Sequence, residues 1–160
     1  MAEKLHKVDS MLILGRGLNW ATADEGALII KNITGIQAES HTLGELKHGS
    51  LAMIDEDSTI IMIMVKDHVY QKCKNGLEQI MARKGRPIMI CTEGDEEVSK
   101  LGLQSLPIPR CDSPYLQSIL AIIPLQLLAY YMAVQSGKDV DVPRPWMAET
   151  AISSVEEIEK

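Results

Sequence analysis

The stretch TIIMIMV, residues 59–65, is apolar at almost every position. A strand with one face in water alternates polar and apolar residues, whereas a strand covered on both faces is apolar throughout. Two more runs of this kind occur, MLILG at residues 11–15 and RPIMIC at residues 86–91. Because sheets buried on both faces are usually parallel and covered by helices, these runs predict an α/β fold.

Segments with helical periodicity separate the apolar runs. Helices are expected at residues 22–32, 69–84 and 113–136, the last opened by Ser113 and Pro114 and ended by Gly137. SLPIP, residues 105–109, is expected to be a short edge strand because its prolines cannot donate to a ladder. The pattern predicts a three-layer αβα sandwich, flavodoxin-like, with a roughly five-stranded parallel sheet.

Length and charge limit the organisation and the partners. The chain of 160 residues suits one domain, at residues 1–145, followed by a tail at residues 146–160. In that tail Ser153 and Glu156 have the spacing of a capping box, which predicts a short helix. The net charge of -6, with no basic cluster, favours neither nucleic acid nor an anionic membrane as a partner. The apolar stretch at residues 119–134 contains Pro124 and is interpreted as a core helix.

The cysteines and the N-terminus indicate the compartment. Cys73, Cys91 and Cys111 are widely spaced and odd in number, which predicts buried, unpaired thiols. The first ten residues, MAEKLHKVDS, are charged and lack the apolar core of a secretory signal. We therefore expect a cytoplasmic protein, with no cofactor and no metal site.

Two short segments contain residues that could do chemistry. The turn Gly15-Arg16-Gly17 lies between a predicted strand and helix, where backbone N–H groups could bind a phosphate, although a lone GxG of this kind is more often only a tight turn. In GELKHG, residues 44–49, His48 could move a proton with Glu45 or Lys47 tuning it. The alternative is a solvated polar loop.

Several segments together resemble one enzyme family, in order and with few gaps from about residue 11 to residue 144. They are LGRG, EGAL, AES, GELKHGSLAMID, IMIMVKDH, ARKGRPIMIC and SILAIIPLQLLAYYMAVQSGKDVDVPR. The chain resembles the C-terminal half of the isomerase region of glutamine:fructose-6-phosphate aminotransferase, also called glucosamine-6-phosphate synthase. The resemblance implies a sugar isomerase (SIS) domain and a link to hexosamine biosynthesis, in which fructose-6-phosphate becomes glucosamine-6-phosphate.

The resemblance also assigns roles to individual residues. The family's helix reads EGALKLKEI where this chain reads EGALIIKNI, so Glu25 and Lys31 match but Asn32 stands at the acid/base carboxylate position. An amide cannot take and return a proton near neutral pH. The family's ring-opening histidine, contributed across a subunit boundary, corresponds to His48. The remnant catalytic residues are therefore His48 and Glu25, and the substrate-binding candidates are Gly15, Arg16, Gly17, Lys31 and Asn32.

Other parts of the family's site have no counterpart. The family ends in NLAKSVTVE, whose lysine forms a Schiff base, but residues 145–148 contain no lysine and the next is Lys160. The family's phosphate loop, with a pattern like S-x-S-G-E-T, is also missing from the chain. The first hypothesis is a catalytically silent SIS domain that binds a sugar phosphate, forms a homodimer or pairs with another SIS domain. The alternatives are a subunit or fragment of an active aminotransferase completed by another chain, and an isomerase that uses Glu45 and His48.

Overall fold

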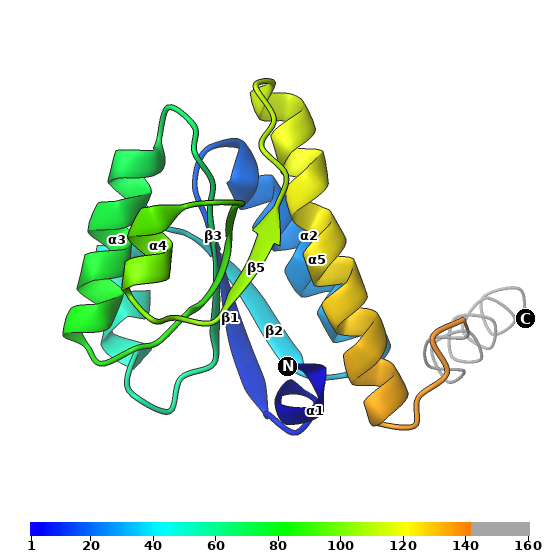
Figure 1. The fold of residues 1–160 in the computed structure, drawn as a ribbon. Coiled ribbons are helices and arrows are strands. Elements are labelled where there is room, and N and C mark those ends of the chain that lie inside the picture. Colours follow the sequence, from blue (N-terminus) through cyan, green and yellow to red (C-terminus); the bar gives the residue numbers. More distant parts are fainter. Residues whose placement is uncertain (142–160) are drawn as a thin grey trace, which may run out of the picture.

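The computed structural model describes residues 1–141, which form a sheet between two layers of helices (Figure 1). The tail predicted at residues 146–160 lies outside the described residues. The elements in chain order are α1 Ala2–Leu5, β1 Ser10–Gly15, α2 Leu18–Thr34, β2 Gln37–Thr42, η1 Leu46–His48, η2 Ser50–Met53, β3 Ile60–Met64, α3 Tyr70–Ala82, β4 Ile88–Thr92, α4 Glu96–Lys100, β5 Ser105–Ile108 and α5 Pro114–Gln135.

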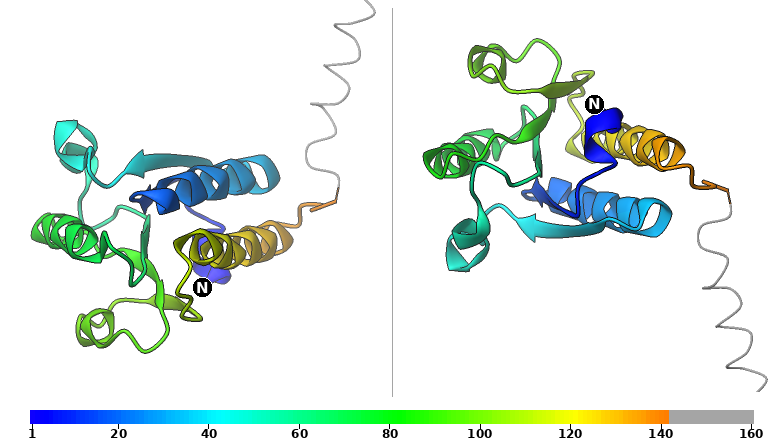
Figure 2. Two further views of the ribbon diagram at one scale, coloured as in Figure 1. Left: turned by 90° about the horizontal axis from the view of Figure 1, so that it is seen from above. Right: turned by 90° about the horizontal axis from the view of Figure 1, so that it is seen from below.

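The sheet has five strands in the order β2-β1-β3-β4-β5, and every neighbouring pair is parallel. Helices α2 and α5 cover one face, and α3 and α4 cover the other (Figures 1 and 2). This arrangement confirms the predicted three-layer α/β sandwich with a parallel sheet.

Each face of the sheet has its own hydrophobic core. Ile61 and Ile63 of β3 pack with Leu125 on the α2 and α5 side, whereas Met62 and Met64 pack on the α3 and α4 side. Successive side chains of a strand point to opposite faces, so a strand covered twice needs apolar residues at every position. All residues of β3 are buried, which explains the sequence TIIMIMV.

Two local features differ from the sequence-based expectation. Strand β2 was not predicted because QAESHT is mostly polar, and only Ala38 in it is buried. It lies at an edge of the sheet, where one side of the strand faces solvent. Helix α2 begins at Leu18 rather than at residue 22, because Gly17, with φ 60°, turns the chain directly from β1 into the helix.

The cysteines only partly follow the prediction. All three are free, and Cys73 and Cys91 are buried. Cys111 is half-buried instead, because it lies in the loop between β5 and α5 rather than in a core element. Burial raises the pKa of the Cys73 thiol to about 12, so this thiol stays protonated at neutral pH.

Helix α5 combines a core face with an exposed apolar face. Ala121, Leu125 and Ala129 are completely buried, and α5 packs against α2. Within residues 1–141 it is the one helix long and apolar enough to cross a membrane, a test that core helices of soluble proteins also pass. Its contacts with α2 agree with the interpretation of residues 119–134 as part of a core helix.

Candidate functional site

The carboxyl ends of β1 and β3 mark the point where the chain connections diverge. Strand β1 has β2 on one side and β3 on the other. In open parallel sheets, ligands bind in the crevice outside the carboxyl ends of the strands at such a switch point. The turn Gly15-Arg16-Gly17 follows β1, and the loop of residues 65–69 follows β3. The two segments meet, since a Cβ added to Gly17 would lie 3.8 Å from Cγ2 of Val69.

The turn after β1 is tightly packed against the first turn of α2. A Cβ at Gly15 would lie 2.0 Å from the carbonyl oxygen of Asn19, so no larger residue fits there. The N–H of Asn19 donates to the carbonyl of Arg16 at 3.2 Å, and the N–H of Trp20 donates to that of Gly17 at 3.1 Å. Two N–H groups at this helix end are therefore already engaged, which reduces what the turn can offer a phosphate through its backbone.

The side chain of Arg16 lies beside the GELKHG segment. A Cβ added to Gly44 would lie 3.1 Å from Nη1 of Arg16, so the guanidinium rests against the backbone of Gly44. GELKHG itself contains the short helix η1. The structure thus brings together the two segments that the sequence singled out separately, and the contact is made by Arg16 rather than by His48.

His48 lies at the surface of η1. Its side chain is 75% exposed, and its Nε2 is 3.9 Å from Oε2 of Glu45, which is 73% exposed. An exposed imidazole at this distance from an exposed carboxylate is held only weakly within this chain.

The candidates on α2 do not gather around one hollow. Glu25 is exposed and lines a mainly apolar hollow with Tyr115 and Ile119 of α5. Lys31 is also exposed but lines a different hollow, which it shares with Glu39 and His41. Asn32 is exposed on the same helix. Glu25 and Lys31 therefore line two different hollows on the surface of this domain.

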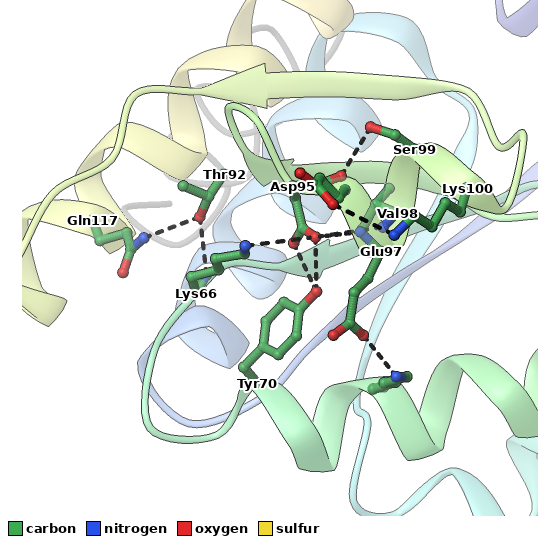
Figure 3. A network of polar contacts seen from close by, with 11 residues as sticks. Lys66, Tyr70, Thr92, Asp95, Glu97, Val98, Ser99, Lys100 and Gln117 are labelled. Atoms are coloured by element: carbon green, nitrogen blue, oxygen red, sulfur yellow. Dashed lines mark hydrogen bonds and ion pairs between the residues drawn. The ribbon is translucent and has the colours of Figure 1, made fainter.

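A buried polar network at the ends of β3 and β4 was not predicted (Figure 3). Its centre is Asp95, whose side chain has no exposed surface. Asp95 caps α4 by accepting hydrogen bonds from the N–H groups of Glu97 and Val98. The Tyr70 hydroxyl donates to Asp95, with its oxygen 2.7 Å from Oδ2 and 2.9 Å from Oδ1, and Nζ of Lys66 is 4.0 Å from Oδ1. Burial, and then the bond to Asp95, raise the pKa of Tyr70.

Thr92 extends the network to a second helix. Its hydroxyl oxygen accepts hydrogen bonds from the N–H of Lys66 at 2.9 Å and from Nε2 of Gln117 at 3.5 Å. These bonds join the loop after β3, the end of β4 and the start of α5. The sequence EGDEEVSK indicates a helix cap, but nothing local in it identifies Tyr70 or Gln117 as partners.

His41 is a second histidine with close polar neighbours that sequence reasoning missed. Its Nδ1 is 3.0 Å from Oγ of Ser50, and its Nε2 is 3.9 Å from Oε2 of Glu39. The second distance is too long for a hydrogen bond, and Ser50 is buried. The group therefore joins β2 to η2 and does not form an accessible nucleophile with a relay behind it.

The sequence pattern that defines the SIS domain family matches residues 4–136. The chain is therefore a SIS domain. It is 48% identical over 144 residues to glutamine–fructose-6-phosphate aminotransferase [isomerizing] 1 of Rattus norvegicus, covering 90% of this chain and 21% of that protein. It is 44% identical over 144 residues to the aminotransferase of Aquifex aeolicus, covering 90% of this chain and 24% of that protein. The SIS domain thus spans about a fifth to a quarter of the length of these relatives.

Solved structures agree with this membership. The C-terminal domain of glucosamine-fructose-6-phosphate aminotransferase from Francisella tularensis has a TM-score of 0.78 and 32% identity, with 87% of this chain and 39% of that one covered. A protein of E. coli CFT073, solved in complex with a ligand, shares the fold, with a TM-score of 0.70, 14% identity and coverage of 85% of this chain and 74% of that one. The predicted resemblance to the aminotransferase family and the predicted SIS fold are both confirmed.

Proposed function

We propose that this SIS domain is catalytically silent and acts as a module that binds a sugar phosphate or pairs with another SIS domain. The observation that carries the proposal is Asn32, which stands at the position that the family resemblance assigns to the acid/base carboxylate. An amide there cannot shuttle a proton between sugar carbons at neutral pH.

The missing amine supports the same conclusion. Imine formation with an open-chain sugar requires a primary amine, which the family supplies with a lysine. Residues 145–148, along the stretch where the family presents that lysine, read PWMA. Residues 146–160 are proposed to be a separate tail that follows the SIS domain of residues 1–145. A cytoplasmic location, supported by the three free cysteines, belongs to the same proposal.

The pairing surface is proposed to be the outer face of α5. Seven large apolar side chains repeat there with helical spacing and are 44–60% exposed, and we call them the α5 stripe: Leu116, Ile119, Ile123, Leu127, Tyr130, Tyr131 and Val134. A continuous exposed apolar stripe is typical of a protein–protein contact. The occupant is proposed to be a second copy of this chain or another SIS domain. An alternative is that Ile152, Val155 and Ile158 of the tail cover the stripe.

An assay of product formation from fructose-6-phosphate tests the proposal. Pure protein is mixed with fructose-6-phosphate and either ammonia or glutamine, and aldose phosphate and amino sugar are measured, with a full-length aminotransferase as the positive control. No product is expected, and borohydride treatment is expected to trap no sugar on any lysine. Product formed at a rate that falls in His48→Ala would contradict the proposal.

A second candidate function is part of an active aminotransferase whose remaining groups come from another chain. Two observations favour it: the chain covers only 21% of its rat relative, and His48 is exposed enough to reach a neighbouring subunit. A chain supplying the glutaminase and first SIS domains is added to the protein, and amino sugar is assayed. This candidate predicts activity in the mixture that is lost with His48→Ala. An inactive mixture that nevertheless forms a stable complex favours the silent module.

A further inference from the structure

One small polar hollow is lined by three cationic side chains that come from separate parts of the chain. The hollow has a volume of about 230 Å³ and lies between η1 and α3. Arg16 comes from the turn after β1, Lys47 from η1 and Lys72 from α3. Leu43, Gly44, Asn75, Gly76 and Gln79 complete the lining, which contains no carboxylate.

None of these three cations forms an ion pair within residues 1–141. Other lysines of the surface do, since Lys84 pairs with Glu56 at 3.4 Å and Lys100 pairs with Glu96 at 3.4 Å. The arrangement is unexpected in a chain of net charge -6, where carboxylates outnumber cations. Like charges that converge on one hollow repel one another, and an anion bound among them removes that cost.

The backbone around the hollow holds the guanidinium and allows the elements to approach closely. Arg16 is half-buried and lies against Gly44, where an added Cβ would be 3.1 Å from Nη1. At Gly76 of α3 an added Cβ would be 2.7 Å from Cγ of Leu43, so a glycine is needed for α3 to pack against the segment before η1. Arg16 is therefore positioned by packing rather than by a carboxylate partner.

We propose that this hollow binds the phosphate group of a phosphate monoester. A guanidinium offers a planar pair of donors that matches two phosphate oxygens, and Lys47 and Lys72 supply further positive charge. The side-chain amides of Asn75 and Gln79 supply neutral donors. The volume is below the roughly 300 Å³ at which drug-sized ligand pockets begin, so it suits a phosphate group whose sugar projects outward.

This site differs from the one expected at the turn Gly15-Arg16-Gly17. The site expected from the sequence uses backbone N–H groups at the start of α2. The proposed hollow instead uses the side chain of Arg16 together with side chains of η1 and α3. The inference rests on the proposed function only for the sugar part of the ligand. Orthophosphate tests the phosphate site by itself.

The experiment measures the binding of orthophosphate and of fructose-6-phosphate to the full chain by calorimetry at low ionic strength. Arg16→Gln and Lys72→Gln are each expected to weaken both affinities about tenfold, which corresponds to about 1.4 kcal/mol. Arg16→Lys keeps the charge but loses the planar fork, so a smaller loss is expected. Lys84→Gln and Lys100→Gln remove matched surface charges outside the hollow and are expected to change neither affinity. Thermal unfolding establishes that every variant is folded.

The outcomes separate this site from the proposed function. Orthophosphate binding that depends on Arg16 and Lys72, without tighter binding of fructose-6-phosphate, supports the site but counts against sugar-phosphate recognition. If Arg16→Gln and Lys72→Gln both bind fructose-6-phosphate as tightly as wild type, the site is overturned and the proposed function stands. No binding of orthophosphate, or equal weakening by Lys84→Gln, overturns the site. If Arg16→Gln and Lys72→Gln change self-association but not phosphate binding, the phosphate site is also overturned, because the cations then belong to a contact between subunits.

Discussion

Asp95 is a carboxylate with no exposed side-chain surface, which is costly unless its oxygens are paired. Two backbone N–H groups at the start of α4, the Tyr70 hydroxyl and the ammonium of Lys66 provide that pairing. The Tyr70 bond is the one that joins α3 to the loop before α4. This hydroxyl therefore helps to hold the two segments together on one face of the sheet, beside the ion pair between Lys74 of α3 and Glu97 of α4 at 2.6 Å.

Replacing Tyr70 with Phe tests this contribution. The expected loss is about 1–2 kcal/mol in the free energy of unfolding, since the bond is made to a charged, buried acceptor. Urea denaturation at pH 7 measures it. The matched control is Tyr115→Phe, because Tyr115 is 72% exposed, and its unfolding free energy is expected to change little. Equal effects of the two substitutions would contradict the role of Tyr70.

The stability difference between wild type and Tyr70→Phe is expected to depend on pH. Folding raises the pKa of Tyr70 above its ordinary value of 10.0, so the native state holds this proton more tightly than the unfolded state does. The resulting stabilisation is complete below pH 10.0 and declines as the pH rises above that value. The difference in unfolding free energy between wild type and Tyr70→Phe should therefore narrow above pH 10.0. A difference that grows with alkaline pH is the contrary result.

At the scale of elements, α2 and α5 form the layer over one face of the sheet (Figure 2), and Gly26 of α2 packs closely against α5. A Cβ at Gly26 would lie 2.4 Å from Cδ1 and 3.2 Å from Cγ of Leu125. Leu125 is completely buried in the core, so a shift of its side chain would disturb the groups packed around it. The glycine of the EGAL motif thus has a packing role that is independent of any role of Glu25.

Gly26→Ala is expected to lower the free energy of unfolding by about 1–2 kcal/mol. Overpacking against Leu125 costs about 1–3 kcal/mol, and the better helix propensity of alanine offsets up to about 1 kcal/mol of that. Thermal and urea unfolding measure the change. Glu25→Ala, an exposed neighbour on the same helix, serves as the control and should stay within about 0.5 kcal/mol of wild type. If Gly26→Ala stabilised the protein, the close packing of α2 and α5 would be refuted.

At the scale of the whole molecule, α5 has one face in the core and the α5 stripe outside. Burying one face against α2 satisfies the fold, so the fold alone does not require apolar residues on the outer face. Exposed apolar area of this extent contributes favourable free energy when it is covered by a partner.

Sedimentation at micromolar concentration is expected to show a dimer. Ile119→Glu and Leu127→Glu, both within the α5 stripe, are expected to shift the protein to monomer while leaving the fold intact, because their side chains are 60% and 52% exposed. Leu101→Glu is the control, since Leu101 is 37% exposed and adjoins α4 on the opposite face of the sheet. A wild-type monomer, or equal dissociation by all three substitutions, would argue against pairing through the stripe.

The sequence by itself determined the layers, three buried strands, the proline-limited edge strand and the long helix over the sheet. These features follow from periodicity and turn residues within short windows, and a strand buried on both faces is recognisable from its own residues. The family was also readable from ordered segments such as EGAL and GELKHG. The polar strand β2 was not predicted, because this edge strand has few apolar residues.

Only the tertiary structure decided which side chains meet. Arg16 lies against Gly44, and Tyr70 bonds to Asp95, 25 positions away in the chain. Glu25 and Lys31 are close in sequence yet line different hollows, because their positions on α2 turn them toward different neighbours. Such contacts depend on how distant elements pack, a property that no short window of sequence contains.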